Sequence, residues 1–345
     1  MHTANSARRL CQGAFAFIIV LSLATIAVQA SAATLKLAYG TADQSTYGHF
    51  AKVFAEEVQT LTDESVKVRT FCCLKMGGEQ EMFKKLQLGT LDGTIIAQNN
   101  AGPFYPKLDI LTLPYVFQNA EHAQTIVNGP IGQQIWADMP DATGVHLIAI
   151  TSVAFRHIFN TKHPIQNLDD FKPLKYRVPK NTVMVDTYDA FGSDPVPLAW
   201  TEALTAVQTG AVDGGDLSLD ILHSQKFYEI AKHVAMTGHF VLAPPFFVSD
   251  RFMKKLSDAE RAAVYQAANT AAASTAKMLA DYEASLTEEL QAKHGVTFTH
   301  PDRAPFIELG QSVQNAFGAE RGADYQAIIQ SIQTAGRPSV SEEAE

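Results

Sequence analysis

Residues 257–295 read SDAERAAVYQAANTAAASTAKMLADYEASLTEELQAKHG, and this stretch decides the fold. Ser257 and Glu260 have the capping-box spacing that opens a helix. Neither proline nor glycine follows before Gly295, which supplies a helix stop. At 1.5 Å per residue, a single helix over this range would be roughly 55 Å long, more than one domain of this size spans. The stretch therefore predicts one helix that bridges two lobes, or else two helices broken without a marker.

The chain before this helix alternates strand-like and helix-like segments. Residues 34–40 alternate apolar and polar side chains and stop at a glycine, as a strand entering a loop does. A helical stripe over 47–60 and a strand over 66–71 follow, and the same alternation returns between residues 145 and 214. Strands that alternate with helices predict an α/β fold with a largely parallel sheet. Because the pattern occurs twice, we expect two α/β lobes.

The N-terminus has the form of a secretory signal peptide. Arg8 and Arg9 are its only charged residues, and an apolar run over 14–28 follows them. This run is shorter than the roughly 20 residues needed to span a membrane. Residues 30–32, Ala-Ser-Ala, have the A-x-A form of a cleavage site. We predict a cleaved signal peptide over residues 1–32 and export to the periplasm; an uncleaved membrane anchor is the alternative.

The charge balance of the mature chain is acidic. Removing residues 1–32 leaves 25 basic and 36 acidic residues, a formal charge of −11. Nucleic acids and anionic membranes bind basic surfaces, so we do not expect them as partners. The acidic tail, residues 337–345, is predicted to be disordered. The adjacent Cys72 and Cys73 exclude a disulfide framework, and we expect two packed thiols rather than a strained ring.

Several segments, in their order and spacing, resemble one known family. The segments are Met76-Gly77-Gly78-Glu79, Leu86–Asp92, Leu113–Phe117, Phe155-Arg156, Leu174–Pro179 and Glu202–Gly214. With them the chain resembles the substrate-binding proteins of tripartite ATP-independent periplasmic (TRAP) transporters, in their DctP-like class. The similarity covers about residues 34–310.

The resemblance implies a periplasmic-binding-protein-like α/β fold, with two α/β lobes around a ligand cleft and a long bridging helix. We place one lobe at 33–153 plus 241–278, and the other at 154–240 plus 279–336. The resemblance also implies that the protein captures a small organic carboxylate and delivers it to a large and a small membrane permease subunit. We expect a monomer with no cofactor and no metal site; a cation bound alongside the ligand, as in some family members, is the alternative.

Arg177 is the first candidate ligand-binding residue. It ends a predicted strand, just before Pro179. A guanidinium can meet a carboxylate through two parallel hydrogen bonds, which lysine cannot reproduce. In proteins that this chain resembles, the matching arginine makes that contact; a surface ion pair is the other interpretation.

Two further candidates lie in the second half of the binding region. Arg156 stands inside a largely apolar strand, and similar proteins use an arginine there at the ligand; a latch to an acidic neighbour is the alternative. Trp200 falls where the family places an aromatic residue against the ligand, and ordinary interlobe packing is the alternative. Where the family commonly has an asparagine that contacts ligand, this chain has Leu217. That departure favours either a ligand with an apolar portion or a polar contact moved to Asp216, and it weakly disfavours heavily hydroxylated sugar acids.

Strand-end loops of the first lobe supply the remaining candidates. Tyr39 follows the first strand, and Gln98 and Asn100 follow the third. Such loops face the cleft in open α/β sheets, so we expect ligand contacts there, with plain loop polarity as the alternative.

Other functions have less support in the sequence. The chain contains no G-x-S-x-G, H-E-x-x-H, P-loop or G-x-G-x-x-G motif, and its eleven histidines show no metal-ligand spacing. We therefore expect no catalytic residues, although a carboxylate-processing enzyme is the alternative from another class. A periplasmic sensor that presents its ligand to a receptor would have the same sequence features.

Overall fold

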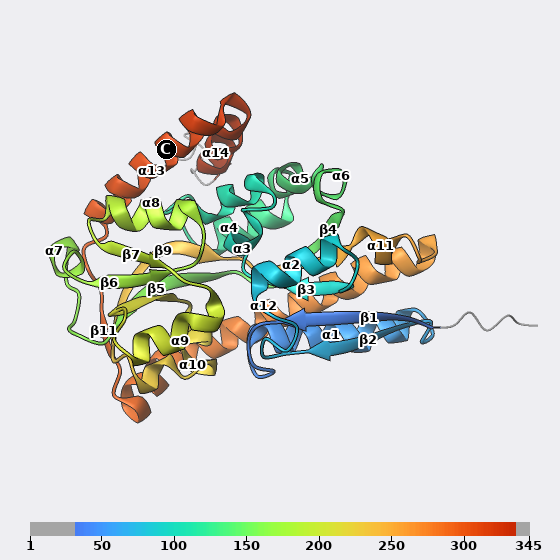
Figure 1. Cartoon of the computed structure of the whole chain (residues 1–345), viewed down its shortest axis with the longest axis horizontal. Coiled ribbons are helices and arrows are strands. Elements are labelled where there is room, and N and C mark those ends of the chain that lie inside the picture. Colours follow the sequence, from blue (N-terminus) through green and yellow to red (C-terminus); the bar gives the residue numbers. More distant parts are fainter. Residues whose placement is uncertain (1–31, 336–345) are drawn as a thin grey trace, which may run out of the picture. The chain divides into compact units, whose positions relative to one another are not determined.

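The computed structural model describes residues 32–335 of the chain. Residues 1–31 of the predicted signal peptide and the predicted disordered tail lie outside this range. Two sheets, each covered by helices, are connected by chain crossings and by one long helix (Figure 1). None of the described helices is long and apolar enough to cross a membrane.

The first sheet has five strands and the second has six. In spatial order the first contains β2 (Val66–Phe71), β1 (Ala33–Tyr39), β3 (Gly93–Ile95), β10 (Pro245–Ser249) and β4 (Val145–Ile150). The second contains β11 (Thr297–Thr299), β9 (His233–Leu242), β5 (Ala154–Asn160), β8 (Gly214–Leu217), β6 (Lys175–Val178) and β7 (Asp194–Pro197). We call each sheet with its helices the first and the second lobe.

The helices are as follows. In chain order they are α1 (Thr46–Leu61), α2 (Glu79–Gln87), α3 (Gln98–Ala101), η1 (Pro106–Thr112), α4 (Ala120–Asn128), α5 (Pro130–Trp136), α6 (Met139–Thr143), α7 (Leu168–Phe171), α8 (Thr182–Ala190), α9 (Trp200–Gln208), α10 (Leu219–Ser224), η2 (Phe227–Glu229), α11 (Asp250–Met253), α12 (Asp258–His294), α13 (Ala304–Arg321) and α14 (Ala323–Ala335).

Both sheets are mixed, so the expectation of largely parallel sheets is only partly correct. β1 pairs in parallel with β2 and β3, but β10 is antiparallel to β3 and β4. In the second sheet β5 is antiparallel to both β8 and β9. The reversed strands lie where the chain passes between lobes, from β4 to β5 and from β9 to β10. A strand that enters a sheet directly from the other lobe needs no helical crossover, and it is therefore free to run antiparallel.

Residues 258–294 form one unbroken helix, which confirms the single-helix prediction. Ser257 accepts a hydrogen bond from the Glu260 backbone N–H, and Glu260 bonds back to the Ser257 N–H at 2.8 Å. Gly295 ends the helix in the left-handed conformation with φ of 65°. α12 packs on α1 and β4 of the first lobe and on α10 and η2 of the second. It therefore braces both lobes, as its predicted length required.

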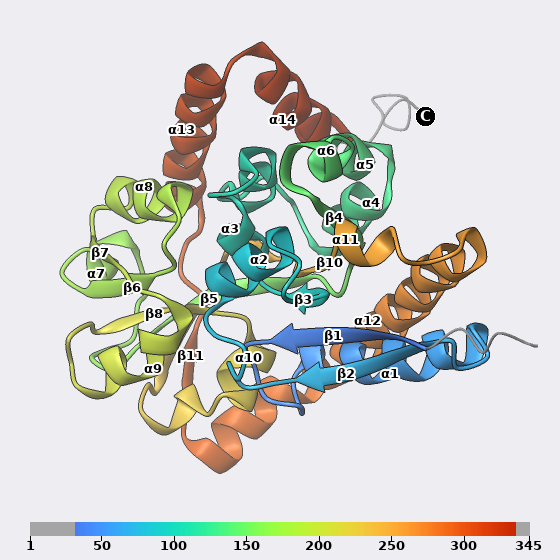
Figure 2. The same ribbon diagram turned by 45° about the vertical axis from the view of Figure 1, so that its right-hand side comes forward.

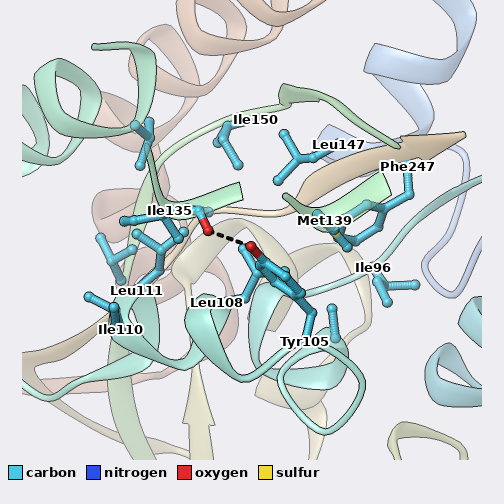
Figure 3. Packing of buried hydrophobic residues seen from close by; sticks show 14 of the residues in the cluster. Ile96, Tyr105, Leu108, Ile110, Leu111, Ile135, Met139, Leu147, Ile150 and Phe247 are labelled. Carbon is cyan, nitrogen blue, oxygen red and sulfur yellow. Dashed lines mark hydrogen bonds between the residues drawn. The ribbon is translucent and has the colours of Figure 1, made fainter. Parts of the chain in front are cut away.

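Aromatic rings form much of the packing between the sheets and their helices. On the first sheet, Phe246 of β10 lies with its ring centroid 4.7 Å from that of Phe54 on α1. On its other face, buried apolar side chains gather around η1, α5 and β4 (Figure 3). Tyr105 reaches into this cluster, and its hydroxyl donates to the Ile135 carbonyl at 2.9 Å, which satisfies the one polar atom that the ring buries.

The C-terminal helices are shared between the lobes. α13 packs on α8 of the second lobe, whereas α14 packs on α4 and α5 of the first (Figure 2). The assignment of residues 279–336 to one lobe therefore does not match the contacts of α14. We keep the other lobe boundaries as a proposal and group α14 with the first lobe.

Cys72 and Cys73 form a disulfide between neighbouring residues, so the expectation of two thiols was wrong. The turn after β2 brings the two side chains together. In this turn Cys73 and Leu74 both have φ of 62°, and the Cys73 N–H donates to the Thr41 carbonyl at 3.1 Å. The backbone of this turn, which the sequence pattern did not reveal, places the sulfurs within bonding reach.

The cap of α12 supplies a test of the fold. Replacing Ser257 with alanine removes the acceptor for the Glu260 N–H, and we expect a loss of about 1 kcal/mol in the free energy of unfolding. Urea unfolding measures this change. Ser285→Ala, at an exposed position inside the same helix, is the matched control and should be close to neutral. An equal loss in both variants would show that the cap does not contribute.

Candidate functional site

A small pocket lies between the two sheets, at the ends of several strands. The first lobe contributes Thr41, Tyr47, Glu79, Ala97, Asn99 and Asn100. The second lobe contributes Arg156, Arg177, Pro179, Trp200, Leu217, Ile221 and Leu242.

Arg177, on β6, is a buried cation in this pocket, with 5% of the residue exposed. Its Nε and Nη2 atoms donate to the Leu198 carbonyl at 3.1 and 2.8 Å. Within residues 32–335 its guanidinium forms no ion pair with a carboxylate. Burial, together with the charge of the neighbouring Arg156, lowers the pKa of Arg177 to about 10, while Asp216 and Glu79 act in the opposite direction without forming an ion pair with it. A buried guanidinium without an anionic partner is costly, and an anion bound beside it would offset that cost.

Arg156, on β5, also lines the pocket, but it has an acidic partner. Its Nε lies 2.5 Å from Asp216 Oδ2, and its Nη2 donates to the Asp216 carbonyl at 2.7 Å. The pair forms because β5 and β8 are neighbours, with Ile158 opposite Asp216. Although burial opposes ionisation, the charge of Arg156 holds the pKa of Asp216 below its usual value. Arg156 therefore pairs with an acidic neighbour, as the alternative interpretation of this residue expected. Asp216 is not among the residues that line the pocket.

Glu79, the first residue of α2, lines the pocket, although it was not among the residues expected to bind ligand. In the sequence it ends the motif Met76-Gly77-Gly78-Glu79. It is buried against the pocket and accepts a hydrogen bond from the Asn100 amide. Burial raises the pKa of Glu79 to about 7, while Asn100 and the two arginines act in the opposite direction. An acid at the start of a helix, directly after Gly77-Gly78, was the available signal, because the backbone there can approach a cleft closely.

The strand-end candidates of the first lobe divide into two groups. Asn100 lines the pocket and so does Asn99, whose Nδ2 finds no hydrogen-bond acceptor among the described residues. Gln98 instead forms hydrogen bonds with the segment that passes between the lobes. Its amide donates to the Val241 carbonyl at 2.8 Å and accepts from the Ala243 N–H at 3.1 Å. Tyr39 is directed elsewhere: its hydroxyl donates to Asp43, and it lines a separate hollow beside α1. Neither Gln98 nor Tyr39 lines the pocket that holds the arginines.

One wall of the pocket is apolar. Trp200 lies with its ring 5.8 Å from the Arg177 guanidinium carbon, and it stacks on Phe227 with the centroids 5.7 Å apart. Leu217, at the end of β8, is buried beside it with Ile221. This wall offers no side-chain hydrogen bond except the indole N–H of Trp200.

Hydrogen bonds join the lobes around the pocket. The Asn181 amide donates to the Asn99 carbonyl at 2.9 Å and to Asp109 Oδ1 at 2.7 Å. The Thr46 hydroxyl donates to Asp220 Oδ2 at 3.0 Å. These contacts reach from the first lobe to the second, so the pocket is enclosed by both.

The chain matches known proteins over most of its length. A Verminephrobacter eiseniae solute-binding protein is 31% identical over 309 residues, covering 90% of this chain and 91% of that protein. A TRAP periplasmic solute-binding protein from Polaromonas sp. JS666, solved with bound D-erythronate, is 34% identical with a TM-score of 0.84, covering 89% of this chain and all of that one. A Roseobacter denitrificans TRAP solute-binding protein, solved with bound L-galactonate, is 30% identical with a TM-score of 0.80, covering 87% of this chain and 98% of that one.

The family model of the bacterial extracellular solute-binding proteins, family 7 (DctP), matches residues 37–320. The expected two-lobed α/β binding-protein fold is confirmed by the structures it matches. Proteins of this kind bind solutes for transport and are not a class of enzymes. The chain belongs to the DctP family of TRAP solute-binding proteins.

Proposed function

We propose that the mature chain is a periplasmic receptor that captures a short hydroxylated carboxylate between its lobes and delivers it to the two membrane subunits of a TRAP transporter. The main support for this proposal is the buried Arg177 guanidinium, which lines the pocket and forms no ion pair with a carboxylate of residues 32–335. The ligands bound by the Polaromonas and Roseobacter relatives, both sugar acids, support the same class.

The anchor of the ligand is its carboxylate. Arg177 has five N–H donors, and the Leu198 carbonyl engages its Nε and one N–H of Nη2. The Nη1 group and the remaining Nη2 N–H are available for a paired contact with two carboxylate oxygens. Arg156 adds a second positive charge to this side of the pocket, while Asp216 holds its guanidinium in place.

The first lobe supplies the groups that suit hydroxyls. Glu79 can accept a hydrogen bond, and the Asn99 amide can donate one through its Nδ2, which has no hydrogen-bond partner within residues 32–335. The side chains of Leu217 and Ile221, by contrast, are apolar and cannot form a hydrogen bond with a hydroxyl. We therefore propose a short hydroxylated acid, for which the four-carbon D-erythronate is the first candidate.

Export and assembly complete the proposal. Cleavage near Ala32 would release the mature chain to the periplasm, where the long α12 couples closure of the two lobes around ligand. The closed form is what the permease would recognise, and the receptor would act as a monomer.

The first experiment is a thermal-shift screen of the mature protein, unfolded and refolded to remove carried-over ligand. The panel contains D-erythronate, L-galactonate and other small organic acids, with erythritol as the neutral counterpart of erythronate and matched amines. A ligand at 100 times its Kd should add about 2.7 kcal/mol of stability and raise the Tm by a few degrees. Carboxylates alone should stabilise the protein. Stabilisation by erythritol or an amine, with none by acids, would overturn the proposal.

Removing the anchor should separate binding from folding. We expect Arg177→Met to lower affinity for the carboxylate found in the screen by at least about 100-fold, because two hydrogen bonds to a charged group are lost. The ligand-free variant should be as stable as the parent or more stable, since an unpaired buried cation is removed. Calorimetry and thermal unfolding measure the two effects. Arg69→Met, at an exposed position of β2, is the control; affinity retained in Arg177→Met would contradict the assignment.

Glu79 should distinguish hydroxylated from plain acids. At pH 8, above the pKa of about 7 that burial gives Glu79, we expect Glu79→Gln to weaken D-erythronate about tenfold, because a charged acceptor for its hydroxyls is replaced by a neutral one. The same variant should bind butanoate, which has the same chain length and no hydroxyl, as well as the parent does or better, since a nearby negative charge is removed. Isothermal titration of both ligands with both proteins measures this. Equal losses for the two acids would show that Glu79 does not contact the hydroxyls.

A further inference from the structure

Away from the cleft, two histidines and a glutamate converge on the second lobe. His223 lies on α10, and Glu289 and His294 lie near the C-terminal end of α12. One possible ligand atom from each side chain lies within 4.8 Å of the others. No metal-ligand spacing marks these residues in the sequence, since more than sixty residues separate His223 from the other two. Packing of α10 against α12 brings them together.

The two imidazoles are held by their surroundings. The His223 Nδ1 atom is 2.5 Å from the Tyr282 hydroxyl, and its Nε2 has no hydrogen bond among the described residues. A hydrogen bond on one ring nitrogen commonly orients the other toward a metal. Tyr228 packs against both rings, with its centroid 5.3 Å from that of His223 and 4.1 Å from that of His294. The side chains are thus oriented by packing that has no part in the cleft.

The negative charge of the cluster comes from one carboxylate. His294 is the last residue of α12, and its carbonyl accepts a hydrogen bond from Lys232 Nζ at 2.8 Å. Glu289 adds a carboxylate, one oxygen of which lies 3.1 Å from the Lys293 ammonium. Its other oxygen remains for a metal. All three side chains are partly exposed, so they can both admit an ion from solvent and rotate to meet it.

We propose that His223, Glu289 and His294 bind a zinc ion. Two imidazoles and a carboxylate are a common zinc ligand set, with a water in the fourth position. Zn–N and Zn–O distances of about 2.0–2.2 Å require ligand atoms roughly 3.4 Å apart in a tetrahedron. Zinc binding would require small rotations of the three side chains that bring these atoms from within 4.8 Å of one another to that spacing. The ion would tie α10 to the end of α12, and this site does not depend on the proposed carboxylate ligand.

The test uses the mature protein without a histidine tag, treated with EDTA and then dialysed. Titration with zinc chloride in the calorimeter should give one site per chain with micromolar affinity or better. Cobalt(II) at the same site should give the intense visible absorption of a tetrahedral complex. His223→Ala and His294→Ala should each weaken zinc at least tenfold and abolish the cobalt absorption. His300→Ala, an exposed histidine outside the cluster, should change neither.

Two further variants keep the outcome interpretable. Glu289→Gln preserves the shape of the side chain and should still weaken zinc, because the anionic ligand is lost. Lys293→Ala removes the competing ammonium and should strengthen zinc binding several-fold. Far-ultraviolet circular dichroism confirms that each variant is folded. No zinc binding at 100 micromolar, or equal weakening in His300→Ala, would overturn the proposal.

Discussion

The desolvated guanidinium of Arg177 organises the binding site. Taking this charge out of water is unfavourable, and the protein leaves it without a carboxylate partner in the described part of the chain. The second arginine, Arg156, stands close enough to disfavour it further, yet Asp216 balances Arg156 through two contacts. The pocket therefore holds one balanced and one unbalanced cation. In the proposed function an anionic ligand would supply the missing charge, and binding would then be linked to the stability of the enclosed form.

The fold keeps this arrangement because each lobe positions a different part of the chemistry. Strand ends of the second sheet present Arg177 and Leu217, and α2 and α3 of the first lobe present Glu79 and Asn99. α12 and the two hydrogen bonds of Gln98 connect the lobes, and neither α12 nor Gln98 lines the pocket. The rigid elements thus set the position of the charged groups, while a few hydrogen bonds across the cleft hold the lobes together.

Two features outside the cleft depend on the same α/β framework. The turn after β2, at one end of the first sheet, carries the Cys72–Cys73 disulfide. Packing of α10 on the end of α12 gathers the histidine and glutamate side chains of the proposed zinc site. In both places the side chains are close because a backbone turn or a helix contact puts them there.

The sequence by itself determined the elements that local interactions stabilise. Capping at Ser257 and the absence of proline or glycine specify α12, since helical hydrogen bonds join residues four apart. The order of strands and helices indicated two lobes, and Arg177 could be chosen from its motif at a strand end.

Tertiary contacts specify the remaining features. The contact between Arg156 and Asp216 depends on strand order and register. Gln98 and Tyr39 form hydrogen bonds with partners outside the pocket. Glu79 reaches the pocket through the packing of α2. These contacts join residues distant in sequence, so no local pattern records them.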